Sequence, residues 1–203
     1  MSLHRLGVVA WFVQPLYLVA EVVTATAVRV PYSFVDDTIS DLGASACTTV
    51  AYPYGDVAVC SPWHLLLNAA FVVSGALMVV GALFVRHRVA GGWVRWLWVV
   101  AGLSSVGTGL VPLDRDLDLH SLVALPALVA MPVALVASGV RLRDRVVTVV
   151  GVVSLAAAVA FVVRVSEPEF GGLFERLAFW PGYVWLGVAG LVALRSTSAR
   201  PRG

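Results

Sequence analysis

The residues with the clearest potential for chemistry lie in a short stretch where acidic side chains alternate along the chain. Asp114, Asp116 and Asp118 occur at every second position, and His120 follows in the same spacing. Carboxylates combined with imidazole are typical ligands of zinc, manganese and iron, and His64 could complete such a set. One hypothesis is therefore a divalent-metal site made of Asp114, Asp116, His120 and His64, where the metal activates water against a lipid ester or phosphate.

The same residue types also suit acid–base chemistry without a metal. In this interpretation His120 exchanges the proton, and Asp114 and Asp41 orient it as members of the catalytic set. Ser40 is a candidate nucleophile beside Asp41, although the sequence has no G-x-S-x-G motif. The candidate substrate-binding residues are Ser40, Glu21, His64, Asn68 and Arg115.

A third interpretation is purely structural. Asp114 and Asp118 would cap the helix that follows them, because the N-terminus of a helix favours acidic side chains. Arg115 would pair with Asp41 or Asp37 and tie down the preceding loop. The residue types alone leave the metal, acid–base and structural interpretations open.

Six apolar runs must position these residues. They cover about residues 6–28, 62–85, 93–112, 119–140, 146–164 and 177–194. Each approaches the ~20 residues that a helix needs to cross ~30 Å of hydrocarbon, and the composition, 60% hydrophobic, excludes a soluble domain. The sequence predicts an all-α polytopic membrane protein, with one six-helix bundle over residues 1–195 and a disordered tail over 196–203.

Charge predicts how the bundle is oriented. The arginines beside the helix ends on one side are Arg5, Arg86, Arg88, Arg95, Arg141, Arg143, Arg145, Arg195, Arg200 and Arg202. Asp144 is the only acid of that side, and the loops of the other side are acidic. The positive-inside rule then makes the arginine-rich side cytoplasmic, with both termini there. The dispersed arginines indicate topology signals and contacts to the bilayer, and no nucleic-acid partner.

The two cysteines, Cys47 and Cys60, both lie in the first outer loop. A pair of cysteines in an oxidising compartment usually forms a disulfide. The alternative is a pair of soft metal ligands, but no further cysteine or histidine is spaced near them as a zinc site requires. The pattern therefore favours a disulfide.

The same outer loop contains a predicted short helix. Asp36 or Asp37 would cap it and Gly43 would end it. Ile39 and Leu42 would then face the membrane.

Two polar residues lie within the first apolar run. Gln14 and Glu21 are seven residues apart and therefore share a helix face. An acid inside the membrane is a candidate functional residue, and the alternative is a structural partner for another helix. Pro126 and Pro132 predict a kink in the fourth helix.

Three stretches together resemble a known family. They are Thr38-Ile39-Ser40-Asp41-Leu42-Gly43, then Ser61-Pro62 with Asn68 and Gly75, and then Pro112-Leu113-Asp114 with His120. They are similar to the bacterial and archaeal membrane proteins of domain-of-unknown-function family 998, over about residues 6–195. The resemblance implies a six-helix integral membrane fold and no settled activity. It also implies that Ser40, Asp41, Asp114 and His120 match the family pattern.

These observations lead to one functional expectation and two alternatives. The expected protein lies in the plasma membrane of a prokaryote and binds or modifies a lipid or lipid-like small molecule at its extracellular rim. The first alternative is a non-catalytic scaffold, sensor or accessory subunit. The second is a small dimeric transporter, because polar groups near the membrane midplane are typical of carriers. The sequence does not identify the cofactor, the protein partners or the oligomeric state.

Overall fold

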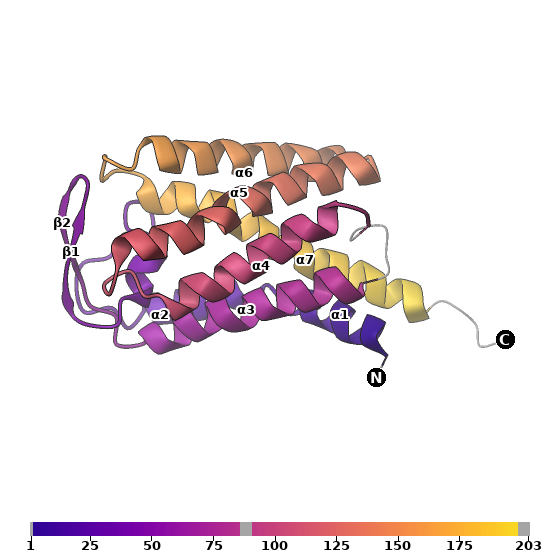
Figure 1. Cartoon of the computed structure of the whole chain (residues 1–203), viewed down its shortest axis with the longest axis horizontal. Coiled ribbons are helices and arrows are strands. Elements are labelled where there is room, and N and C mark those ends of the chain that lie inside the picture. Colours follow the sequence, from indigo (N-terminus) through magenta and orange to yellow (C-terminus); the bar gives the residue numbers. More distant parts are fainter. Residues whose placement is uncertain (1, 86–90, 199–203) are drawn as a thin grey trace.

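The predicted membrane-spanning helices form a single bundle (Figure 1). A computed structural model describes residues 2–85 and 91–198. The helices are α1 (Leu3–Phe12), α2 (Leu16–Ala25), α3 (His64–Phe84), α4 (Val94–Leu110), α5 (Leu117–Leu142), α6 (Arg145–Val163) and α7 (Gly171–Ser198). Within the described residues, five spans are long and apolar enough to cross a bilayer, with α1 and α2 counted as one. The sixth, α4, is about 26 Å long at 1.5 Å per residue and packs against α3 and α5. The all-α six-helix membrane fold is therefore confirmed.

The first span is two helices and not the single helix predicted for residues 6–28. The break falls at Pro15, which has no N–H to donate to the preceding turn. The N–H of Leu16 donates to the carbonyl of Val13 (3.0 Å), so a tight turn replaces the helical pattern here. The second piece ends at Ala25, three residues earlier than predicted, and leaves a longer outer loop.

Two other helix boundaries differ from the prediction. α3 begins at His64 and not at the predicted residue 62, and the carbonyl of Ser61 accepts the N–H of His64 (3.1 Å). α7 begins at Gly171, six residues before the predicted start at 177. This earlier start places two charged residues on a helix that were predicted to lie in a loop.

The helices pack around a core of aromatic side chains. Consecutive helices from α3 to α6 lie against one another, and α7 returns to contact α1, α5 and α6. Trp11, Trp98, Tyr17 and Tyr183 are buried between them. The rings of Tyr17 and Tyr183 stack with their centroids 4.2 Å apart, which joins the first span to α7.

Ser104 of α4 supports the proline-containing part of α5. Pro126 and Pro132 both lie inside this helix. The hydroxyl of Ser104 donates to the carbonyl of Val123 and accepts the N–H of Ala127 (2.9 Å). It therefore bridges two backbone groups that bond each other directly in a regular helix, and it satisfies both of them inside the bundle.

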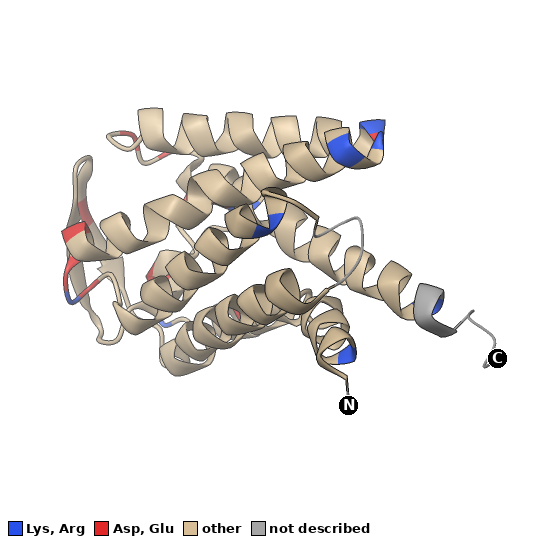
Figure 2. Cartoon of the chain, turned by 45° about the vertical axis from the view of Figure 1, so that its right-hand side comes forward, with Lys and Arg blue, Asp and Glu red and all other residues tan. Residues whose placement is uncertain are grey.

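Charged residues lie mainly at the two ends of the bundle (Figure 2). We call one of them the arginine end, and its described arginines are Arg5, Arg95, Arg141, Arg143, Arg145 and Arg195. The opposite end, which carries most of the acids, is the acidic end. Arg86, Arg88, Arg200 and Arg202 lie outside the described residues. So does the predicted tail from residue 199 onward, whereas residues 196–198 continue α7.

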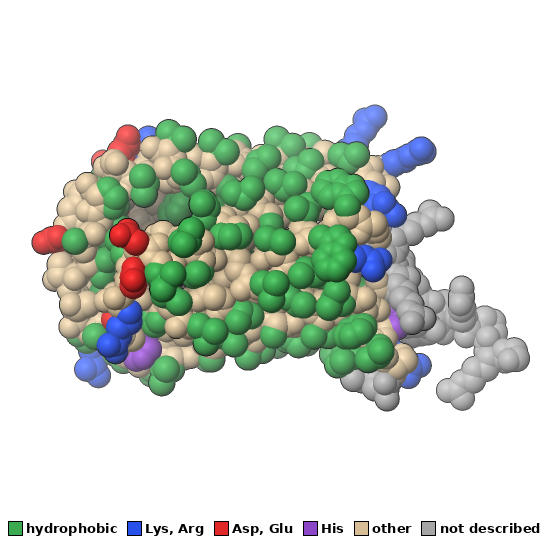
Figure 3. Space-filling view, in the orientation of Figure 1, with side chains coloured by type: hydrophobic (Ala, Val, Ile, Leu, Met, Phe, Trp, Pro, Cys, Tyr) green, Lys and Arg blue, Asp and Glu red, His purple; other side chains and the backbone are tan. Residues whose placement is uncertain are grey.

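Hydrophobic side chains cover the surface between the two ends (Figure 3). Such a belt fits the hydrocarbon of a bilayer. The face drawn in Figure 3 is hollowed between α5 and α6, on the side of the acidic end.

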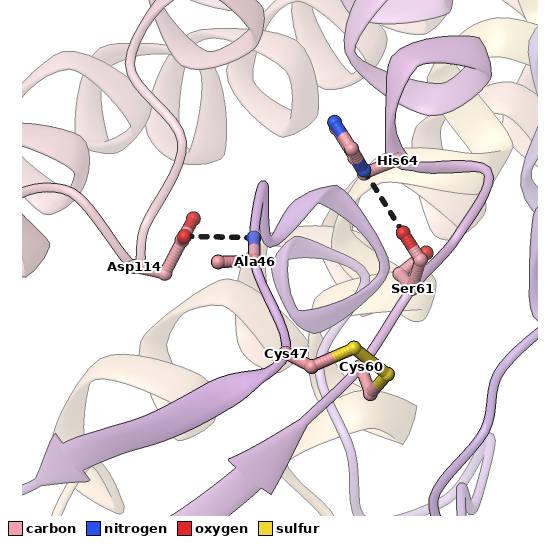
Figure 4. Close-up of a disulfide and its surroundings, with 6 residues drawn as sticks. All are labelled: Ala46, Cys47, Cys60, Ser61, His64 and Asp114. Atoms are coloured by element: carbon pink, nitrogen blue, oxygen red, sulfur yellow. Dashed lines mark hydrogen bonds between the residues drawn. A yellow bond between two sulfur atoms is a disulfide. The ribbon is translucent and has the colours of Figure 1, made fainter.

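An antiparallel hairpin, which the sequence analysis did not predict, covers part of the acidic end. It consists of β1 (Thr48–Tyr52) and β2 (Gly55–Val59). Cys47 and Cys60 directly precede and follow the paired strands, and they form the predicted disulfide (Figure 4). The buried hairpin residues Val50 and Val59 pack with Leu113 at the end of the bundle.

We expect replacement of both cysteines by serine to destabilise the protein by about 3 kcal/mol. The disulfide closes a short loop, and for about 14 residues the chain-entropy model gives a value of this size. Thermal unfolding of the purified protein in detergent measures the effect. Reduction of the wild-type protein should lower the unfolding temperature by the same amount and leave the serine variant unchanged. Equal unfolding temperatures of wild type and variant would contradict the prediction.

Candidate functional site

Ser40 is held at the acidic end by a short 3₁₀ helix, η1 (Ser40–Gly43). The hydroxyl oxygen of Thr38 accepts the N–H of Asp41 (3.2 Å), and the Asp41 carboxylate accepts the N–H of Thr38 (2.7 Å). This reciprocal arrangement is a capping box. Asp41 therefore fixes the backbone that presents Ser40 and does not contact His120 as the predicted catalytic set required.

Two predictions about this short helix are wrong: which way its apolar side chains face, and which residues cap it. Ile39 and Leu42 are fully buried in the bundle and do not face the membrane. Asp36 and Asp37 do not cap η1, because they hold the turn before it: the N–H of Ser33 donates to the Asp37 carboxylate (2.6 Å), and the Ser33 hydroxyl donates to that of Asp36 (2.9 Å). The short helix is thus part of the core and not an interfacial segment.

The last residue of η1 is anchored on α3. The side-chain amide of Asn68 donates to the carbonyl of Gly43 (2.8 Å). A Cβ at position 43 would lie only 2.6 Å from the Asn68 side-chain oxygen, so this close contact requires glycine. Asn68 positions the loop that carries Ser40, and its role in substrate binding stays a prediction.

His120 lies in the first turns of α5, whose N-terminus is capped by Asp116 through the N–H of Leu119 (2.9 Å). Its Nδ1 lies 2.6 Å from the carbonyl oxygen of Val111. A carbonyl only accepts, so Nδ1 carries a proton and donates it. In the neutral ring Nε2 is then an acceptor, and it lies 2.9 Å from the hydroxyl of Ser40. The hydroxyl of Ser40 can therefore donate to His120, which is the geometry of a nucleophile and its base.

Glu175, in the first turns of α7, completes this site. Its Oε2 accepts the N–H of Ile39 (2.5 Å), and its Oε1 lies 3.5 Å from the Ser40 hydroxyl. The shorter distance makes His120 the better acceptor for the Ser40 proton. Glu175 and His120 are buried, whereas Ser40 is half-buried. We call these three residues the Ser40–His120 site.

A buried acid and a tyrosine flank the site. Burial raises the pKa of Asp41 above its ordinary value, and hydrogen bonds from Tyr52 and Thr38 oppose this shift. The hydroxyl of Tyr52 donates to the Asp41 carboxylate (2.6 Å). Burial and the Asp41 charge raise the pKa of Tyr52, so the phenol keeps its proton at neutral pH and ties the hairpin to η1.

We expect the protein to lose stability as the pH rises through the raised pKa of Asp41. An acid with a higher pKa in the folded than in the unfolded protein binds more protons when folded, and between the two pKa values stability decreases with rising pH. The loss is absent below the unfolded pKa and complete above the folded pKa. Thermal unfolding from acidic to neutral pH measures it, with Asp41→Asn as the variant that lacks this contribution. Identical pH slopes for wild type and variant would show that Asp41 has no raised pKa.

An ion pair joins the first span to α7. The Nε of Arg176 lies 3.0 Å from Glu21 Oε1, and the two side chains are 5% and 0% exposed. Trp180 donates its indole N–H to the other Glu21 oxygen (2.9 Å). Glu21 was predicted to bind substrate, and these contacts favour its structural alternative.

The remaining donors of Arg176 fasten the outer loop. Its Nη1 donates to the carbonyls of Phe34 (2.8 Å) and Asp37 (2.9 Å), and its Nη2 donates to the Tyr32 hydroxyl. The guanidinium also lies over the Phe34 ring, 4.8 Å from its centroid. The loop that leads into η1 is thus held by an arginine that also binds Glu21 of the first span.

Sequence reasoning missed Glu175 and Arg176 as site residues. The apolar run was taken to begin at residue 177, so both residues were assigned to a loop. The available signal was the four-residue spacing of Leu173 and Leu177, which continues the helix backwards across the two charges.

Asp114 and Arg115 hold another part of the outer loop. The Asp114 carboxylate accepts the N–H (2.7 Å) and the hydroxyl (2.9 Å) of Ser45. Arg115 donates to the Ser45 hydroxyl oxygen (2.8 Å) and not to Asp41 or Asp37, the partners predicted for it. Asp114 therefore does not orient His120 directly.

The predicted metal ligands have separate partners. Asp114 turns toward the backbone of the loop, whereas His64 donates from Nδ1 to the carbonyl of Ser61 (2.9 Å) (Figure 4). Asp116 caps α5, and His120 belongs to the Ser40–His120 site. Across residues 2–85 and 91–198, no group of three or more histidine, cysteine or acidic residues could hold a metal ion.

Comparison with known proteins agrees with the fold. The profile of a family described as protein of unknown function (DUF998) matches residues 12–192. The chain belongs to the DUF998 family. The predicted resemblance is thereby confirmed, and the match runs from the last residue of α1 into α7. No curated protein and no solved structure matched the chain.

Proposed function

We propose that this DUF998 protein is a membrane enzyme that cleaves or transfers the acyl ester of a lipid or lipid-like molecule. The observation behind the proposal is the 2.9 Å contact between the Ser40 hydroxyl and Nε2 of His120. The Val111 carbonyl keeps the proton on Nδ1 and leaves Nε2 free to accept. A histidine so arranged is a general base for an adjacent hydroxyl nucleophile.

The reaction begins when the Ser40 oxygen attacks the acyl carbon and its proton moves to His120 Nε2. The protonated imidazole then returns this proton to the leaving alcohol, and the acyl group stays on Ser40. Water, or a second alcohol, attacks the acyl-serine with His120 again as base and restores the free hydroxyl. Glu175 acts as a positioning residue in this scheme, because its bond to the Ile39 N–H holds the backbone next to Ser40.

The location of the site supports an amphipathic substrate. Ser40 is half-buried at the acidic end, and hydrophobic side chains cover the surface between the two ends of the bundle (Figure 3). The hollow between α5 and α6 (Figure 3) gives an acyl chain a lateral approach near the end of α5 that carries His120. A lipid could thus present its ester at the membrane boundary and leave its chain in the hydrocarbon.

We further propose that the protein lies in a prokaryotic plasma membrane with both termini in the cytoplasm. The positive-inside rule assigns the arginine end to the cytoplasm. The Cys47–Cys60 disulfide supports the same orientation independently, since it lies at the acidic end and disulfides persist in oxidising compartments. A C-terminal fusion to a phosphatase that is active only outside the cytoplasm should be inactive. An active fusion would reverse the orientation.

A non-catalytic scaffold or sensor is the second candidate. It is favoured by the structural roles of Asp36, Asp37, Asp41 and Asp114, whose carboxylates all accept hydrogen bonds from the outer loop. In this role the Ser40–His120 contact would also serve only to hold the loop.

Ester turnover distinguishes the two candidates. The purified protein is tested with acyl esters of increasing chain length in mixed micelles, together with Ser40→Ala and the control Ser166→Ala, an exposed serine at the same end. The proposal predicts turnover that increases with chain length, is lost in Ser40→Ala and is retained in Ser166→Ala. Absence of turnover in the wild type, or equal turnover in both variants, would contradict catalysis by Ser40.

A further inference from the structure

A cavity lies at the arginine end, far from the Ser40–His120 site. It has a volume of about 360 Å³ and runs between the start of α4 and the second half of α5. Its lining residues are Trp93, Val94, Val133, Val136, Ala137, Val140 and Arg141. A cavity of this size is comparable to pockets that hold small ligands.

The residues of this groove are ordered by depth. Arg141 lies in the last turn of α5, and Trp93 precedes the first turn of α4. Both positions are at the membrane–water boundary, where tryptophan and arginine side chains gather. Val133 is eight residues before Arg141 and therefore about 12 Å deeper along the helix. The groove thus has a charged mouth at headgroup level and apolar walls that reach into the hydrocarbon.

The charge around the mouth is positive. Arg143 follows α5 in the turn to α6, Arg145 is the first residue of α6, and Arg95 lies in the first turn of α4. The carboxylate of Asp144, the acid in this turn, accepts the N–H groups of the first residues of α6 (2.9 and 3.1 Å). Its charge is therefore directed to a helix N-terminus.

Two glycines lie close to the guanidinium of Arg141 at the mouth. A Cβ at Gly91 would be 2.6 Å from Nη2 of Arg141, and a Cβ at Gly92 would be 3.2 Å from Nη1. Gly92 also has a φ of +66°, which side-chain-bearing residues rarely adopt. The turn before α4 therefore packs closely against the guanidinium.

We propose that this groove binds an anionic glycerophospholipid. The phosphate lies against Arg141, with the neighbouring arginines adding long-range attraction, and one acyl chain fills the space between α4 and α5. Charge complementarity selects an anionic headgroup, and the apolar walls select a lipid over a soluble phosphate. This site is independent of the proposed ester chemistry at the opposite end.

Lipid titration of the purified protein in detergent tests the proposal. Binding of phosphatidylglycerol and of phosphatidylcholine with identical chains is measured by native mass spectrometry, and the unfolding temperature is measured in parallel. We expect preferential binding of phosphatidylglycerol, with an affinity reduced about fivefold in Arg141→Gln, as expected for the loss of one arginine near anionic lipid. Arg195→Gln, at the end of α7, is the matched control and keeps the wild-type affinity.

Two further samples test the apolar part of the site. Val140 lines the groove and is 64% exposed, so Val140→Trp changes the groove without disturbing the core. This variant should lose phosphatidylglycerol binding although every arginine is retained, and glycerol phosphate alone should not stabilise the wild type. Equal binding of both lipids, equal losses in Arg141→Gln and Arg195→Gln, unchanged binding by Val140→Trp, or stabilisation by glycerol phosphate would each overturn the proposal.

Discussion

The Glu21→Gln variant is expected to be less stable than the wild type by about 3–5 kcal/mol, the usual effect of removing one partner of a buried ion pair. Glu21 is fully buried, and the change leaves the charge of Arg176 inside the bundle without its acid. The loss should spread to the outer loop, because Arg176 also holds the carbonyls of Phe34 and Asp37. Thermal unfolding in detergent micelles measures the effect.

Two controls show whether the loss of stability comes from the unpaired buried charge. Glu169→Gln removes an exposed acid close to the start of α7 and should leave the unfolding temperature unchanged. The double variant Glu21→Gln/Arg176→Met removes both charges and should recover part of the stability, because no unpaired charge is then left inside. A Glu21→Gln protein as stable as the wild type would show that the pair does not hold the bundle together. It would return Glu21 to the candidate functional residues inside the membrane.

The His120→Gln variant is expected to lower ester turnover by about 10²–10⁴-fold, the usual contribution of a general base. Glutamine cannot take the proton from Ser40, although its size is close to that of the imidazole. Initial rates with a long-chain ester in micelles measure the loss, and the unfolding temperature shows whether the variant is folded.

His64→Gln is the matched control for His120→Gln. His64 also lies at the acidic end, but its ring donates to the Ser61 carbonyl and does not contact Ser40. It should therefore keep nearly full turnover. Equal losses in the two histidine variants would indicate a general effect on the acidic end, and undiminished turnover in His120→Gln would exclude His120 as the base.

Much of the fold follows from periodicity and charge. Apolar runs of membrane length predicted the six spans, and the position of the arginines predicted which loops share an end of the bundle. The break at Pro15 was missed because both halves of the first span are apolar, and hydropathy does not register a tight turn. The hairpin was missed because its strands are only five residues long and most of their residues are exposed.

The candidate site was predictable only in part. Ser40 and His120 were both selected as chemical residues, but nothing in their spacing shows that they touch across 80 positions of the chain. Asp41, predicted to orient His120, instead forms a capping box with Thr38, a pattern that the spacing T-x-x-D contains. Glu175 was not predicted as a site residue because hydropathy placed the start of α7 too late. Long-range contacts of this kind depend on how helices pack, which a single sequence does not specify.

The roles of the acids illustrate the same limit. The alternating acids Asp114, Asp116 and Asp118 suit metal binding. However, a helix begins at Leu117, so their side chains point in different directions. Asp116 becomes the cap of that helix, and Asp114 turns back to Ser45. Capping and metal binding require the same residue types, so only the local backbone distinguishes them.

The most direct test of the account is covalent labelling of the purified protein with a fluorophosphonate, which reacts with activated serine hydroxyls. Peptide mass spectrometry then locates the adduct. The account predicts one modified serine, Ser40, in the wild type and in His64→Gln, and strongly reduced labelling in His120→Gln. No adduct on Ser40, or labelling that persists in Ser40→Ala at the wild-type rate, would contradict the claim that Ser40 and His120 form a catalytic pair.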